Sequence, residues 1–123
     1  MLKKIAYLFF IPFLVNFVSG DVQEASEKSI FQNVQVKGEG GSYTVTGEAN
    51  TKEGQIFYTV EDGHYQYITE TVLSLSKKSA QFQINIKLPP EKLPENATLI
   101  LHLYEKDDNG RILHSYPVVL EQK

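Results

Sequence analysis

The sequence predicts an all-β protein, an immunoglobulin-like antiparallel β-sandwich of about seven strands preceded by an N-terminal signal-peptide helix. Three observations lead to this prediction. Apolar residues alternate with polar ones along several short segments, which is the period of a half-buried strand. Turn signals rich in glycine, asparagine and aspartate separate these segments. No stretch shows the sustained i, i+3, i+4 apolar spacing of an amphipathic helix.

The N-terminus has the pattern of an export signal. Lys3 and Lys4 precede an apolar run from 5 to 18, which is shorter than the roughly 20 residues that cross a bilayer as a helix. Small residues at the end of this run match a signal-peptidase site, so cleavage is expected before Asp21. Residues 1–20 are therefore predicted to be a signal peptide, with an uncleaved N-terminal anchor as the alternative.

The rest of the chain divides into a linker and one domain. Residues 21–29 are polar and lack a strand pattern, which is typical of a linker. Residues 30–123 have the size of a single sandwich domain. The clearest strand alternates apolar and polar residues from Ala80 to Leu88. The predicted strands are Ile30 to Val36, Ser42 to Ala49, Gln55 to Glu61, Tyr65 to Thr71, Ser79 to Leu88, Thr98 to Glu105 and Ile112 to Leu120.

Three positions carry a structural expectation of their own. Gly47 falls on the inward-facing parity of its strand, where a missing side chain permits a close approach of a neighbour. Asn109-Gly110 suits the positive φ of a hairpin turn. Pro117 lacks an N–H, so the last strand is expected at a sheet edge or with that position facing solvent.

Composition and charge exclude several classes of protein. Among 123 residues there is no cysteine, which excludes disulfides, thiolate metal sites and a cysteine nucleophile. Export without cysteine is more typical of a bacterial exoprotein than of a eukaryotic secreted domain. Loss of the signal with its two lysines leaves 10 basic residues of the original 12 against 15 acidic ones, a net charge of −5. We therefore expect no nucleic-acid partner.

The order of several short motifs resembles a known domain. The stretch from Tyr43 to Ala49, followed by Glu53-Gly54-Gln55-Ile56-Phe57-Tyr58, is similar to the V-x-G-x-A … E-G … Y core of the bacterial immunoglobulin-like domain found beside GerMN domains in spore germination proteins. Similarity continues through Asp108-Asn109-Gly110-Arg111 and Pro117-Val118-Val119-Leu120. The resemblance implies a sandwich in an envelope or spore context, and that family has no catalytic residues to carry over.

Two weak metal motifs occur near the last hairpin. If the sixth and seventh strands pair, His102 and His114 could lie opposite each other as a two-ligand transition-metal site. Glu105 to Gly110 has the oxygen side chains and the glycine of the first half of a calcium loop. Tyr116, however, stands where the closing glutamate is needed. We favour an ordinary hairpin turn for Glu105 to Gly110 and isolated surface positions for the histidines, and we expect neither a metal nor another cofactor.

The strongest functional candidate is a surface. The parity that points Tyr58 and Leu101 inward places Phe57, Ile100, Tyr104 and Val119, together with His102, on the outer side of one sheet. Gathered apolar and aromatic residues on an exposed sheet favour contact with a protein or glycan. The alternative is that another segment of the chain covers this face.

These observations lead to competing functional hypotheses. The first is a non-enzymatic binding or accessory module, exported to the cell envelope or spore, that contacts an envelope protein or glycan; a membrane enters only if the signal is retained. The second is a secreted regulator of a protease acting through the longest loop, Pro89 to Asn96. The third is an enzyme, for which the sequence lacks a nucleophile elbow, a zinc-protease motif and a phosphate loop.

Overall fold

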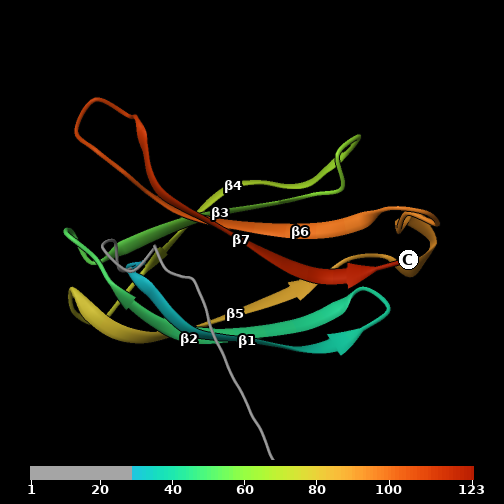
Figure 1. The fold of residues 1–123 in the computed structure, drawn as a ribbon, viewed down its shortest axis with the longest axis horizontal. Coiled ribbons are helices and arrows are strands. Elements are labelled where there is room, and N and C mark those ends of the chain that lie inside the picture. Colours follow the sequence, from blue (N-terminus) through green and yellow to red (C-terminus); the bar gives the residue numbers. More distant parts are fainter. Residues whose placement is uncertain (1–28) are drawn as a thin grey trace, which may run out of the picture.

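The computed structural model describes residues 29–123, which form seven strands and one short 3-10 helix (Figure 1). The signal peptide predicted for 1–20, and the linker up to residue 28, lie outside the described residues. No helix in the described part of the chain is long and apolar enough to span a membrane. The elements are β1 (Phe31–Glu39), β2 (Ser42–Asn50), β3 (Gln55–Glu61), β4 (Gln66–Ser74), β5 (Ser79–Lys87), η2 (Pro90–Lys92), β6 (Thr98–Lys106) and β7 (Ile112–Gln122).

The strands form two layers that face each other across a common core (Figure 1). One sheet has three strands in the order β1-β2-β5, and the other has four in the order β4-β3-β6-β7. Every pair of neighbouring strands is antiparallel. The prediction of an immunoglobulin-like antiparallel sandwich is therefore confirmed.

The core is built from the side chains that point inward, which alternate with outward-pointing ones along each strand. On β5 the side chains of Phe82, Ile84 and Ile86 are buried while the residues between them are exposed. Removing such side chains from water contributes about 1.5–3 kcal/mol each to folding. The most deeply buried side chains are Phe31, Val45, Ile56, Val60, Ile86, Leu99, Leu101 and Leu103.

Both special positions in the strands behave as predicted. A Cβ built on Gly47 would lie 2.9 Å from the ring of Phe82, so a bare backbone is required where β2 and β5 pack. Pro117 lies on β7, which is an edge of the four-stranded sheet, and is exposed. An edge position accommodates a residue that cannot donate a ladder hydrogen bond.

A polar contact joins the two sheets on the side where β1 and β7 meet. The Tyr43 hydroxyl on β2 donates a hydrogen bond to the Glu121 carboxylate on β7, and it accepts one from the Gly41 N–H at 3.1 Å. Burial and the hydrogen bond to Glu121 raise the pKa of Tyr43 to about 12. The same hydrogen bond lowers the pKa of Glu121.

Several strands run further than the sequence indicates. β1 continues to Glu39 instead of Val36, because Gly38 and Glu39 still pair with β2 across a tight hairpin. β4 continues to Ser74 instead of Thr71, because its last residues remain paired with the start of β3. Ladder pairing supplies partners for backbone groups even where the side-chain alternation has faded.

Candidate functional site

The two outer faces of the sandwich differ sharply in chemistry. The outward positions of the three-stranded sheet are polar on all three strands. They are Gln32, Gln35 and Lys37 on β1, Thr44, Thr46 and Glu48 on β2, and Gln81, Gln83, Asn85 and Lys87 on β5. The four-stranded sheet instead presents apolar and aromatic side chains on each of its strands. The outward-facing apolar and aromatic side chains are therefore a feature of the four-stranded sheet and not of the whole domain.

The predicted contact residues lie on the outer face of the four-stranded sheet and form two pairs. Ile100 on β6 is directly opposite Val119 on β7, and Val119 is 54% exposed. Phe57 on β3 is directly opposite Tyr104 on β6. The first pair therefore lies near one end of the face, and the second lies towards the other.

Tyr104 is a correction to the expected surface, because it is only 4% exposed. Its ring stacks on Phe57 with centroids 5.9 Å apart, and its hydroxyl donates a 2.6 Å hydrogen bond to Glu70 on β4. The Lys106 ammonium donates to the same carboxylate at 2.8 Å and lies 5.4 Å from the centre of the Phe57 ring. The Tyr104 side chain is thus buried by contacts with neighbouring residues, although it lies on the predicted outer face.

The carboxylate of Glu70 is the centre of this arrangement. Its hydrogen bonds from Lys106 and Tyr104 lower its pKa, the lysine contact being the larger cause. Burial, together with the bond to Glu70, raises the pKa of Tyr104. Around neutral pH the carboxyl group of Glu70 is therefore ionised and the phenol of Tyr104 is neutral.

A second polar pair lies beside the first. His102 Nε2 is 2.7 Å from Glu61 Oε2, which connects β6 to the end of β3. This hydrogen bond is the main cause of a lowered pKa at Glu61. The pair contributes polar groups to a groove of about 420 Å³ on the outer face, whose walls include Ile112 and Gln66. Figure 1 shows the β3–β4 and β6–β7 hairpins bending away from the three-stranded sheet at opposite ends of this face.

The two histidines of the alternative metal site do not lie opposite each other. His102 lies opposite Pro117, whereas His114 lies at a register shift of β7, with φ 57, and its Nε2 is 3.8 Å from Glu105. The shift carries His114 away from the expected cross-strand position. In the part of the chain that the structure describes, no group of three or more histidine or acidic side chains is placed to hold a metal ion.

The calcium-like motif forms a hairpin turn. Oδ1 of Asp107 accepts hydrogen bonds from the backbone N–H groups of Asn109 and Arg111, at 2.9 and 2.8 Å. Its Oδ2 accepts another from the Arg111 guanidinium at 2.8 Å. Both carboxylate oxygens therefore stabilise the turn itself, which is the alternative explanation of these residues.

Sequence reasoning missed an exposed aromatic side chain in the β3–β4 turn. Tyr65 is 64% exposed, the highest value among the large apolar side chains of residues 29–123, and its ring contacts Tyr67 with centroids 5.5 Å apart. Asp62 holds the turn by accepting hydrogen bonds from the backbone of His64 and Tyr65 and from the Tyr67 hydroxyl. The Asp-Gly turn signal predicted the bend, but it did not predict an exposed ring beside it.

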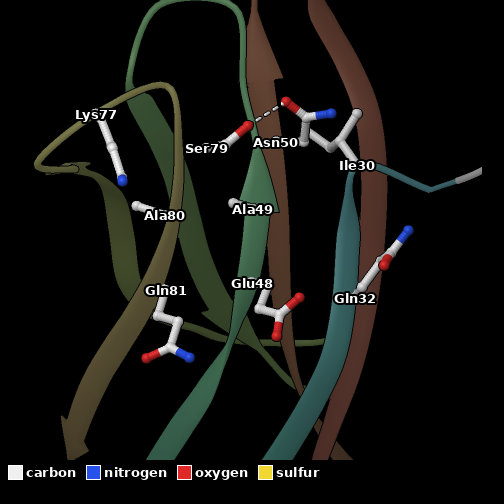
Figure 2. Close-up of a pocket in the computed structure, with 9 residues that line it drawn as sticks. All are labelled: Ile30, Gln32, Glu48, Ala49, Asn50, Lys77, Ser79, Ala80 and Gln81. Atoms are coloured by element: carbon white, nitrogen blue, oxygen red, sulfur yellow. Dashed lines mark hydrogen bonds between the residues drawn. The ribbon is translucent and has the colours of Figure 1, made fainter.

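A separate pocket opens at the end of the three-stranded sheet (Figure 2). Ala49 and Ala80, which are directly opposite each other on β2 and β5, are among the residues that line it, and Ser79 Oγ donates a 2.7 Å hydrogen bond to Asn50 Oδ1 at its upper end. Glu48 is the one carboxylate among its lining residues, and no histidine lines it.

Comparison with known proteins gave no match to a family model, to a curated protein or to a solved structure.

Proposed function

We propose that this chain is an exported, non-enzymatic binding or accessory module of the bacterial cell envelope or spore, and that its contact surface is the outer face of the four-stranded sheet. The contact is centred on Ile100 and Val119. Phe57 and Tyr104 lie further along the same face, where their rings stack on each other. The resemblance to the immunoglobulin-like domain of spore germination proteins favours an envelope or spore setting for this activity.

One observation carries the proposal: only one of the two outer faces presents apolar or aromatic side chains on every strand. In a sheet with one solvated face, inward apolar residues normally alternate with outward polar residues along each strand, as they do in the three-stranded sheet. Exposed apolar side chains rimmed by polar groups are a common feature of interaction sites. Here Glu61, His102 and Lys106 supply that polar rim.

The proposed ligand is an envelope protein or glycan. Apolar side chains at the centre would contact a hydrophobic surface, and the carboxylate and imidazole groups around them would bond to amides or hydroxyls. Regulation of a protease through the Pro89 to Asn96 loop is less favoured. Leu93 from this loop packs against the core, and residues Pro90–Lys92 form the short helix η2, so the loop lies against the domain.

The proposal is tested with two matched variants. Val119→Asp places a carboxylate on an exposed, outward-facing position of the edge strand β7, and Gln35→Asp does the same on the edge strand β1 of the other sheet. Both are immobilised beside the wild-type chain and exposed to envelope and spore extracts. We expect components retained by the wild type and by Gln35→Asp to be lost with Val119→Asp.

Two further measurements make this result specific. Each variant must keep the wild-type midpoint of thermal unfolding, so that loss of binding is not loss of fold. Protease digestion of the extract before capture separates a protein ligand from a glycan. Equal retention by Val119→Asp and the wild type would rule out the outer face as the contact surface.

A further inference from the structure

The four edges of the two sheets are protected to different degrees. Edge strands expose unpaired backbone groups, and proteins block them with proline, charge or bulges. β7 carries Pro117 and a register shift at His114, while β1 carries a shift at Asn33, with φ 55, and an outward Lys37. β4 pairs irregularly with β3, with two register shifts in the ladder. Three of the four edges therefore contain such a feature.

β5 is the least protected edge, because its one charged residue, Lys87, is the last of the strand. Its nine residues pair with β2 in an unbroken antiparallel register from Ser79 to Lys87, with no bulge. Between Ser79 and Ile86 it contains no proline, glycine or charged residue. Within residues 29–123 no strand pairs with its other side. It is therefore a template for one more strand, with an unbroken register and no charged residue before Lys87.

We infer that β5 binds the β5 strand of a second copy of this chain, so that two three-stranded sheets join into one continuous antiparallel sheet. A symmetric pair of antiparallel strands is centred on one residue, which lies opposite itself. The midpoint of Ser79–Lys87 is Gln83, so centring the pair there uses the whole strand.

Side-chain chemistry favours this register. Centred on Gln83, the pair places Gln81 opposite Asn85 on the outer face, and amide groups both donate and accept hydrogen bonds. The same alignment places Phe82 opposite Ile84 on the core side, where cross-strand apolar pairs are favourable. Lys87 falls opposite Ser79, so the two lysines of the dimer are at opposite ends.

A shift of the centre by one residue is less favourable. Centring on Phe82 would place Lys87 opposite Lys77, and directly opposed like charges destabilise a strand pair. Centring on Ile84 would place Ser79 opposite Pro89, beyond the end of the strand. Only the register centred on Gln83 therefore pairs all nine residues of β5 with each other. This self-complementarity is the reason for assigning a second copy, in preference to an unrelated extended peptide, as the occupant of the edge.

The first test is the mass of the full chain in solution, measured by sedimentation velocity over a wide range of concentration. We expect a concentration-dependent dimer. Gln83→Lys brings two ammonium groups together at the centre of the pair and should remove the dimer, whereas Gln35→Lys, on the outer face of β1, should leave it intact. Both side chains are exposed, so neither change removes core packing.

The second test fixes the register and uses the absence of cysteine from the chain. Residues directly opposite each other have Cβ atoms about 4.5–5.5 Å apart. A short bismaleimide should therefore join two copies of Gln83→Cys efficiently. In the same register the two copies of position 81 are about 13 Å apart along the strand, at about 3.3 Å per residue, so Gln81→Cys should join poorly.

Three outcomes would overturn the inference: a monomer at every concentration, a dimer that survives Gln83→Lys, or equal cross-linking of Gln83→Cys and Gln35→Cys. Equal cross-linking at positions 81 and 83 would overturn the register. None of these results affects the binding proposal, because β5 belongs to the other sheet and Val119 does not touch it.

Discussion

The hydroxyl of Tyr104 on β6 reaches across strand β3 and donates a hydrogen bond of 2.6 Å to Glu70 on β4. Lys106, which is also on β6, donates a 2.8 Å hydrogen bond to the same carboxylate. Three neighbouring strands are therefore linked on the outer face by side chains as well as by their backbone ladders. Tyr104 belongs to the framework of the contact surface, and Ile100 and Val119 remain accessible on it.

Removing the Tyr104 ring should destabilise the domain. Because this side chain is almost fully buried and stacks on Phe57, we expect Tyr104→Ala to lower the free energy of unfolding by about 3 kcal/mol. Tyr104→Phe keeps the ring and loses only the bond to Glu70, so its effect should be clearly smaller. Urea unfolding followed by circular dichroism measures both. A Tyr104→Ala variant with the wild-type midpoint would show that the ring contributes nothing to stability.

The sequence predicts the faces of this sandwich well, because side-chain direction in a strand has a period of two residues. Parity alone assigned Phe57, Ile100 and Val119 to the outer face of one sheet, where the structure places them. Parity does not say whether an outward side chain is exposed. The exposure of Tyr104 depends on its contact with Glu70, which is 34 residues away in the chain and two strands away in the sheet.

Cross-strand registers were predicted less well, for a different physical reason. The pairing of β6 with β7 contains register shifts, and each shift changes which residues face each other beyond it. His114 adopts a positive φ at one of them, a conformation that is uncommon for histidine and that no local sequence signal indicates. For this reason the alternative pairing of His102 with His114 is not formed.

A buried carboxylate should stabilise the turn between β2 and β3. Glu105 is 7% exposed and its Oε2 accepts a 2.8 Å hydrogen bond from the backbone N–H of Lys52. Glu105→Ala leaves that donor without its partner, and we expect a loss of about 1–2 kcal/mol in the free energy of unfolding. Glu105→Gln retains an acceptor oxygen and should lose less. Chemical denaturation of both variants decides this, and an equal loss would show that charge, not hydrogen bonding, is what the turn requires.

The packing at Gly47 makes a sharp prediction about added volume. A methyl group there would meet the Phe82 ring at 2.9 Å and Val34 Cγ2 at 3.1 Å. Overpacking of this kind costs about 1–3 kcal/mol, so Gly47→Ala should lower the melting temperature, whereas Glu48→Ala, at the exposed neighbour, should change it little. Combining Gly47→Ala with Phe82→Leu should cost less than the sum of the two single changes, since the smaller side chain makes room. If the effects of the two single changes on thermal unfolding add up strictly, the strain caused by Gly47→Ala does not come from contact with Phe82.

Stability should fall in acid, and the Tyr43–Glu121 contact between the sheets should account for part of the fall. The hydrogen bond from Tyr43 lowers the pKa of Glu121 in the folded protein below its ordinary value of 4.5. A depressed folded-state pKa means that the carboxylate stabilises the fold fully above the unfolded pKa. That stabilisation is lost as the pH falls through the folded-state pKa. The lowered pKa values of Glu61, Asp62, Glu70 and Asp107 act in the same direction.

Glu121→Gln separates this contribution from the others. The amide oxygen can still accept hydrogen bonds from Tyr43 and from the Gly40 N–H, but it does not titrate. We therefore expect the free energy of unfolding, measured by urea denaturation from pH 6 to pH 3, to decrease less steeply for Glu121→Gln than for the wild type. Glu39→Gln, at an exposed glutamate of β1, is the matched control and should follow the wild-type curve. If both variants decrease in parallel with the wild type, the contact between the sheets does not depend on the charge of Glu121.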